Sequence, residues 1–298
     1  MPIKEIKIDL APGLRKLDVY SRRDILSKTM EGEWSTVFKG RGIEFAGFRV
    51  YQYGDDASLI DWKASLRAND TLIREFDEFK NFTVFFLFDV SDSMLFSSTA
   101  KLKCEFAAEL IYVLADAVNK GGDSVGMAMF NQDFVNKIYP DIGAEIIRRI
   151  RTNVSDPENY GGGFDFKKAL LLARSLLQKK AVLIIVSDFI GLEEGWERYA
   201  QMMSEDFELI GLMVRDRRDI ELPRKGGQYM LKNPYSNENI YIDLKHYSKL
   251  YNERVKQEIS KIHNIFTRSR GDFLLLPTDE EYISKVISFF QRRSKRQD

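Results

Sequence analysis

The chain has 298 residues with 45 basic and 45 acidic side chains, so its net charge is zero when histidine is neutral. This balance argues against a general nucleic-acid-binding protein, which normally carries an excess of basic residues. A single cysteine, Cys104, excludes an intrachain disulfide and a thiolate zinc site, and the two histidines, His246 and His263, are too few for a three-histidine zinc centre.

The first eighty residues differ in pattern from the rest of the chain. Residues 14–27 are predicted to be helical and residues 71–79 to be extended, with short glycine-punctuated segments between them. No linker rich in proline or glycine follows this part. We therefore expect residues 1–80 to form a small N-terminal α+β subdomain that docks on an α/β domain of residues 81–298.

From residue 82 onward, predicted strands alternate with predicted helices. The longest apolar runs cover residues 83–88 and 181–186, far fewer than the roughly 20 residues of a membrane helix. They are typical of parallel strands that are buried on both faces. Because strands separated by helices form doubly wound sheets, the predicted fold class is α/β with a mostly parallel sheet. Further strands are predicted over residues 124–130, 133–139, 207–214 and 272–277, a hairpin around residues 233–237, and helices over residues 101–119, 144–151, 166–178, 194–203, 244–269 and 279–292.

Some single residues have structural interpretations within these elements. Cys104 is expected to be a small core residue on the helix after the first strand of the sheet. His246 and His263 are expected on the surface of a late helix, and Thr278 is placed to cap the last helix. The N-terminus lacks the apolar core of a signal peptide, so we expect a cytoplasmic protein.

Oxygen-bearing side chains follow the first strand of the predicted sheet. Asp89 ends that strand, and Ser91 and Ser93 follow at alternate positions. A second strand ends at Asp188, and ligands of open α/β sheets bind at such strand ends where the strand order reverses. If the two strands are neighbours there, the two carboxylates repel each other unless a cation lies between them. Hard oxygen ligands of this kind suit Mg²⁺.

Each of these signals also has an ordinary structural explanation. Serine and aspartate are ordinary turn and helix-capping residues, so the Asp-x-Ser-x-Ser pattern alone indicates no more than a turn. The second aspartate at the matching strand end is what favours a metal site. The glycine run of residues 161–163 permits close backbone approach before Asp165, although a loop and an N-cap give the same pattern.

Together these motifs resemble the metal-ion-dependent adhesion site of a von Willebrand factor A domain. The resemblance implies a Rossmann-like fold and a site for Mg²⁺, or another divalent cation such as Mn²⁺. In the adhesion site of von Willebrand factor A domains, a threonine ligand follows the glycine-rich loop. That threonine aligns with Phe164 here, whose apolar ring cannot serve as a metal ligand. Asp165 is then the candidate substitute. The expected metal ligands are Asp89, Ser91, Ser93, Asp188 and Asp165.

The upstream segment narrows the resemblance to one family. GRGIEF, RVY, YGDD and IDW, between residues 40 and 62, are similar to the signature of the domain of unknown function 58 (DUF58) family, and the match extends over residues 38–94. Members of this family are bacterial or archaeal and are often encoded beside MoxR-type AAA+ ATPases. The resemblance implies a MoxR-type ATPase, or its client protein, as the partner.

The charged residues of the same segment have two possible roles, one structural and one enzymatic. The structural interpretation, which we favour, is a buried ion network beside Tyr51, Tyr53 and Trp62 that fixes the subdomain on the sheet. The enzymatic interpretation pairs Asp55 and Asp56 as acid and base or as metal ligands. The charged members of the expected network are Glu44, Arg49, Asp55, Asp56, Asp61 and Arg67.

Three functions remain open from the sequence. The first is a non-enzymatic interaction module whose cation binds an acidic group of a partner. The second is a metal-dependent phosphoester hydrolase, for which no obvious base or second metal cluster is present. The third is a structural domain whose metal site has decayed, as Phe164 suggests. ATP hydrolysis is not expected, because no phosphate-binding glycine loop of the known kinds occurs.

Overall fold

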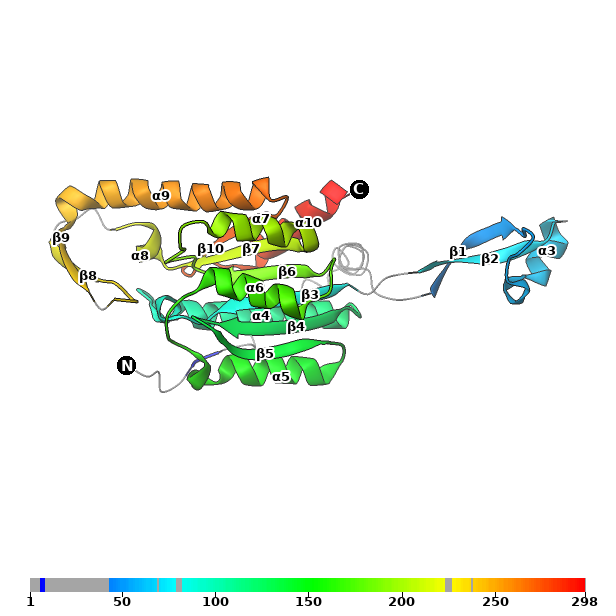
Figure 1. The fold of residues 1–298 in the computed structure, drawn as a ribbon, viewed down its shortest axis with the longest axis horizontal. Coiled ribbons are helices and arrows are strands. Elements are labelled where there is room, and N and C mark those ends of the chain that lie inside the picture. Colours follow the sequence, from blue (N-terminus) through cyan, green and yellow to red (C-terminus); the bar gives the residue numbers. More distant parts are fainter. Residues whose placement is uncertain are drawn as a thin grey trace.

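A central sheet of six strands organises the protein (Figure 1). The computed structural model describes residues 6–8, 43–68, 70–78, 82–222, 227–236 and 238–297. The strands lie in the order β10-β7-β6-β3-β4-β5, and all neighbours are parallel except β5, which is antiparallel to β4. The predicted doubly wound, mostly parallel α/β sheet is therefore confirmed. Its strands are β3 (Thr83–Asp89), β4 (Ser124–Phe130), β5 (Phe134–Asp141), β6 (Val182–Ser187), β7 (Glu208–Arg215) and β10 (Asp272–Pro277).

Helices cover both faces of this sheet, and the alternation of side chains along β3 shows why. Phe86 and Phe88 point to one face and pack in a core with α4, α5 and α10. Phe85 and Leu87 point to the other face and pack with α6, α7 and α9. Because both faces are buried, the strand is a continuous apolar run rather than an alternating one. The helices are α4 (Lys103–Lys120), α5 (Ala144–Ser155), α6 (Phe166–Leu176), α7 (Trp196–Asp206), α9 (Leu244–Arg268) and α10 (Ile283–Gln297).

The order of the strands places a switch point beside β3. From β3 the chain passes to β4 and β5 on one side, and then returns to β6 on the other side of β3. The carboxyl ends of β3 and β6 therefore lie next to each other where the direction of winding reverses. Open α/β sheets bind ligands at this position.

Several single-residue predictions can be compared with the structure. Cys104 is fully buried, and His246 and His263 are exposed on α9, as expected. The predicted cap of the last helix is wrong: α10 begins at Ile283, and Thr278 Oγ1 is buried without a hydrogen-bond partner. No helix of the described residues is long and apolar enough to cross a membrane.

The upstream signature forms a two-stranded antiparallel ribbon of β1 (Ile43–Val50) and β2 (Leu72–Glu78), joined through η1 (Ala57–Leu59) and α3 (Trp62–Ala68). Arg49 donates two hydrogen bonds to the Asp55 carboxylate, at 2.7 and 2.9 Å, and thereby lowers the pKa of Asp55 to about 2.

The predicted buried ion network does not form among the side chains that the structure describes. The side chains of Arg49 and Asp55 are 39% and 20% exposed, so their ion pair is open to solvent. Tyr53 is fully exposed and Trp62 is 67% exposed, so neither packs beside the pair. Asp56 caps η1 by accepting a hydrogen bond from Ser58 N at 2.9 Å, which is the ordinary turn role of an aspartate.

The predicted docking of residues 1–80 on the sheet stays a prediction. Figure 1 shows β1, β2 and α3 away from the six-stranded sheet. Of the residues before them, residues 6–8 are described, and they do contact the α/β domain: Ile6 is buried in the α4 side of the core and Lys7 N donates to Glu105 at 2.7 Å. The helix predicted over residues 14–27 lies outside the described residues.

Asp123, just before β4, makes the stability of the fold dependent on pH. Its side chain is fully buried, Oδ1 accepts a hydrogen bond from Phe82 N at 3.1 Å, and Oδ2 has no hydrogen-bond partner. Burial raises the pKa of Asp123 to about 7. Between about pH 4 and pH 7 the unfolded chain releases this proton while the folded chain keeps it, so the stability falls as the pH rises through this range.

We expect Asp123→Asn to remove this loss, because the amide oxygen still accepts from Phe82 N while the charge is gone. The free energy of unfolding at pH 8 should rise by about 1–3 kcal/mol, and the difference should vanish near pH 4. Urea denaturation at several pH values measures it. Asp116→Asn, which alters an ion pair with Lys120 on the surface of α4, is the control. An equal gain at pH 4 and pH 8 would contradict the assignment.

Candidate metal centre

The loop after β3 gathers three oxygen-bearing side chains. Asp89 ends the strand, and Ser91 is the N-cap residue of the short helix η2 (Asp92–Leu95). Asp89 Oδ1 accepts a hydrogen bond from Ser91 N at 2.9 Å, which curls the loop back on the strand end. The Ser91 and Ser93 hydroxyls lie 3.3 Å apart, and all three side chains are buried. The Asp-x-Ser-x-Ser pattern therefore folds into one compact cluster.

The end of β6 lies directly beside this cluster. β3 and β6 pair in parallel with Phe88 opposite Val186, which confirms that the two strand ends are neighbours. Ser187 Oγ donates to Asp89 Oδ2 at 2.6 Å. Asp188 is fully buried, and its Oδ1 accepts from Ile190 N at 2.9 Å. Ser187 is a site residue that the sequence analysis missed, although its position at a strand end beside Asp188 was a usable signal.

A lysine already contacts the second carboxylate. Lys103, at the start of α4, is 1% exposed, and its Nζ lies 2.7 Å from Asp188 Oδ2 and 2.5 Å from Asp219 Oδ2. Asp219 belongs to the short helix α8 (Arg217–Ile220) after β7. Burial lowers the pKa of Lys103, but the two carboxylates outweigh burial and raise it, so the side chain is a fixed cation. No local pattern in the sequence indicated this role.

The electrostatics of the cluster favour a further cation near Asp89. Burial raises the pKa of Asp89, and the negative charge of Asp188 raises it further. Asp89, Ser91 and Ser93 offer only hard oxygen atoms, which fit Mg²⁺ or Mn²⁺ better than a softer metal. Among the described residues, no group of three or more histidine, cysteine, aspartate and glutamate side chains could hold a metal ion, so any site here must rely on the hydroxyls.

A tyrosine from a distant part of the chain covers the cluster. Tyr235 lies between β8 (Gln228–Lys232) and β9 (Asn239–Asp243), the predicted hairpin. Its hydroxyl lies 3.1 Å from Ser91 Oγ and donates to Ile190 O at 3.2 Å. Its ring stacks on Phe164 with centroids 6.3 Å apart. Phe164 thus packs against the residue that covers Ser91, a contact no sequence spacing revealed.

The glycine-rich loop lies against the same cluster. Gly162 has a positive φ of 99°, and its N–H and C=O both bond Asp92, at 3.1 and 2.9 Å. A Cβ at Gly162 would meet the Asn131 side chain at 2.7 Å, so the close approach requires glycine. Asp165 is the N-cap residue of α6 and accepts from Lys168 N at 2.8 Å. Its role as a metal ligand stays a prediction.

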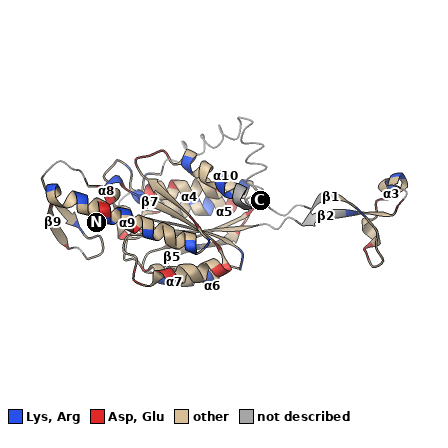
Figure 2. Ribbon diagram, turned by 90° about the horizontal axis from the view of Figure 1, so that it is seen from above, with Lys and Arg blue, Asp and Glu red and all other residues tan. Residues whose placement is uncertain are grey.

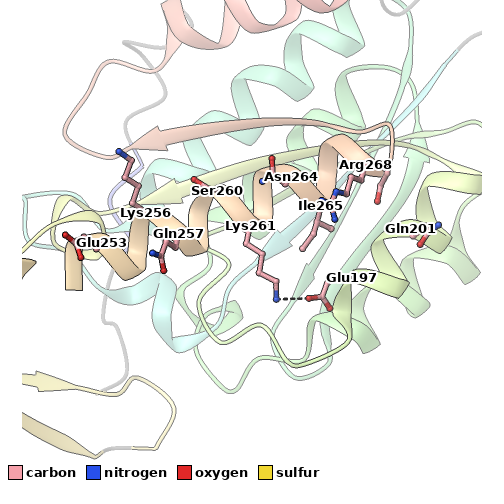
Figure 3. A pocket seen from close by; sticks show the side chains of 11 residues that line it. Glu197, Gln201, Glu253, Lys256, Gln257, Ser260, Lys261, Asn264, Ile265 and Arg268 are labelled. Carbon is pink, nitrogen blue, oxygen red and sulfur yellow. Dashed lines mark ion pairs between the residues drawn. The ribbon is translucent and has the colours of Figure 1, made fainter. Parts of the chain in front are cut away.

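A groove with a volume of 920 Å³ lies elsewhere, between α7 and α9 (Figure 3). Glu197 and Lys261 form an ion pair across it at 2.9 Å. Acidic and basic side chains line this groove together, so it has no single sign of charge: Glu197, Glu253, Lys256, Lys261 and Arg268. Figure 2 marks several of the basic residues of α9. None of the expected metal ligands lines this groove.

Comparison with known proteins gives one family match and several distant relatives. A family model described as "Protein of unknown function DUF58" matches residues 47–260. "Uncharacterized protein Rv1480" from Mycobacterium tuberculosis is 25% identical over 221 residues, which cover 73% of this chain and 68% of that protein.

Two solved structures are similar to this chain. The chain is similar to the conserved hypothetical protein BatB from Bacteroides thetaiotaomicron, at 21% identity and a TM-score of 0.50, over 72% of this chain and all of that one. A von Willebrand factor type A protein from Catenulispora acidiphila has 11% identity and a TM-score of 0.41, over 75% of this chain and 43% of that one.

Proposed function

This chain belongs to the DUF58 family, and we propose that it is a non-enzymatic interaction module that binds one divalent cation, Mg²⁺ or Mn²⁺, at the loop after β3. One observation carries the proposal. The buried Asp89 carboxylate, two hydroxyls and the neighbouring Asp188 meet at the switch point of the sheet. The residues that would hold the cation are Asp89, Ser91 and Ser93, with Asp188 on the far side and Asp165 as a further candidate.

The charge balance explains why such a module would bind a partner. Lys103 already neutralises part of the charge of Asp188, so Asp89 is the carboxylate that is free of a cationic side chain among the residues described around it. A divalent cation held by one full carboxylate and neutral hydroxyls keeps an attraction for a further negative oxygen. An aspartate or glutamate of another protein supplies that oxygen, so the metal site becomes an interface.

The partner we propose is a MoxR-type AAA+ ATPase or its client protein, in complex assembly or maturation. This part of the proposal rests on the family resemblance and on the acidic group that the site would accept. Such ATPases act where ATP is available, so the proposal places this chain in the cytoplasm.

We expect association with a MoxR-type ATPase from the same organism to require the divalent cation. Capture of the purified ATPase on the immobilised chain should be strong in Mg²⁺, be lost in EDTA and return when Mg²⁺ is restored. The immobilised Asp89→Asn protein is the control for effects of Mg²⁺ on the ATPase itself. Equal capture in Mg²⁺ and in EDTA would contradict a metal-dependent interface.

A further inference from the structure

Tyr235 contacts the candidate metal centre from outside the α/β sheet. It reaches Ser91 across a separation of 144 residues, with its hydroxyl 3.1 Å from the serine oxygen. The same hydroxyl donates to Ile190 O in the loop after β6. One phenol group thus joins the two loops that frame the switch point.

Specific residues pack closely around the Tyr235 ring. Phe164 stacks on one side at an interplanar angle of 25°. On another side lies Gly191, where an added Cβ would come within 2.8 Å of the Tyr235 ring. The only residue that leaves this space is glycine, and its φ of +89° is also one that glycine adopts readily. The position of the Tyr235 ring is therefore fixed by specific packing.

The hairpin that carries Tyr235 is not part of the main sheet. Within the described part of the chain, β8 and β9 pair with each other and with no other strand, and Figure 1 shows them outside the six-stranded sheet, next to the start of α9. Their side chains are open to solvent, with Met230 55%, Ile240 62% and Tyr241 73% exposed. Two-stranded hairpins are only marginally stable alone, so the contacts of Tyr235 help to hold this one in place.

We propose that Tyr235 occupies the position through which an acidic partner group would reach the cation, so that the β8–β9 hairpin and the partner compete for it. This inference rests on the proposed function and adds to it a state in which the β8–β9 hairpin covers the metal centre. The phenol hydroxyl bonds Ser91 as a neutral group, whereas a carboxylate brings the negative charge that the cation attracts. The hairpin therefore covers the centre and yields to an acid once a cation is bound.

Chemical labelling tests whether Tyr235 covers Ser91, without any metal. A Ser91→Cys protein is treated with iodoacetamide, and alkylation at position 91 is followed by mass spectrometry. The native Cys104 should react very slowly with iodoacetamide, because it is buried and burial raises its pKa to about 12. Adding Tyr235→Ala should accelerate labelling by about tenfold, as expected if a hydrogen bond and a ring stack are lost.

Three further variants make the labelling test specific. Tyr235→Phe keeps the ring and should accelerate labelling by only a few fold. Tyr241→Ala, in the same hairpin but without contact to the cluster, should leave the rate unchanged. Gly191→Ala should displace the ring and act like Tyr235→Ala, which provides a second route if that variant folds poorly. Equal labelling rates with and without Tyr235→Ala, in proteins with the same unfolding transition, would overturn the inference.

A second measurement separates this inference from the proposed function. Calorimetry with Mn²⁺, and then with acetate as a minimal carboxylate, is performed on the unmodified protein and on Tyr235→Ala. Competition predicts about tenfold tighter acetate binding by the Mn²⁺-loaded variant. Mn²⁺ binding with equal acetate affinities would refute the competition but leave the metal site intact. Failure of both proteins to bind Mn²⁺ would refute the proposed function, while labelling still decides whether the tyrosine covers Ser91.

Discussion

Replacing Asp89 with asparagine is expected to stabilise the metal-free protein and to abolish its response to Mg²⁺. The carboxylate is buried beside Asp188, and both burial and that charge raise its pKa, so its ionised form is costly at neutral pH. An asparagine of the same shape removes the repulsion and still accepts the hydrogen bond from Ser91 N, while its amide nitrogen donates to Ser187 Oγ in place of the bond that Asp89 Oδ2 accepts. We expect the free energy of unfolding at pH 8 without metal to rise by about 1–2 kcal/mol.

The same substitution removes the anchoring ligand of the proposed cation. A ligand present at a hundred times its dissociation constant stabilises a protein by about 2.7 kcal/mol, and this increment should disappear in Asp89→Asn. Denaturation with and without Mg²⁺ measures both effects in one experiment. Asp92→Asn is the matched control, because Asp92 lies in the same loop and bonds the backbone of Gly162. A variant that is less stable without metal yet equally stabilised by Mg²⁺ would refute this assignment of Asp89.

The part of this site that lies on the sheet was predictable from sequence because it depends on strand order. The apolar runs before Asp89 and before Ser187 identify two strands buried on both faces, and such strands occupy the centre of a doubly wound sheet. Carboxylates at the ends of two central parallel strands must lie on the same edge. These two facts place Asp89 and Asp188 on one edge, and the pairing of β3 with β6 in the structure makes them neighbours.

The remaining contacts of the site come from elements whose packing has no local signal. Lys103 begins α4, where a lysine is ordinarily exposed, and its burial is explained by Asp188 after β6 and Asp219 on α8, which both pair with it. Tyr235 lies between two short strands with mostly exposed side chains, and nothing near it in sequence indicates that its hydroxyl reaches Ser91. Tertiary placement of α8 and of the hairpin, not spacing along the chain, creates both contacts.

In the upstream signature, the sequence predicted a contact correctly but not its burial. Its alternation of charged and aromatic residues resembled a packed network, and Arg49 does pair with Asp55. Yet Tyr53 and Trp62 are open to solvent, although Ile73 of β2 is buried. A pattern of residue types predicts which side chains pair locally but not whether another layer buries them.

Lys103 differs from a surface lysine in what its removal would leave behind. Its ammonium group lies between Asp188 and Asp219, which are 0% and 13% exposed in their side chains. Substituting one partner of a buried ion pair leaves the other charge without compensation, and the cost is typically about 3–5 kcal/mol. Here one cation serves two carboxylates, so both lose their counter-charge together.

We therefore expect Lys103→Met, which keeps the length of the side chain, to lower the free energy of unfolding by about 3–5 kcal/mol without metal. Mg²⁺ should then stabilise the variant more than the unmodified protein, because the freed Asp188 charge adds to the attraction that Asp89 exerts on the same cation. Lys120→Met, at the other end of α4, removes an exposed pair with Asp116 and should cost less than about 1 kcal/mol. Urea denaturation of the three proteins with and without Mg²⁺ measures this difference. An equal Mg²⁺ increment in the unmodified protein and Lys103→Met would mean that Asp188 takes no part in holding the cation.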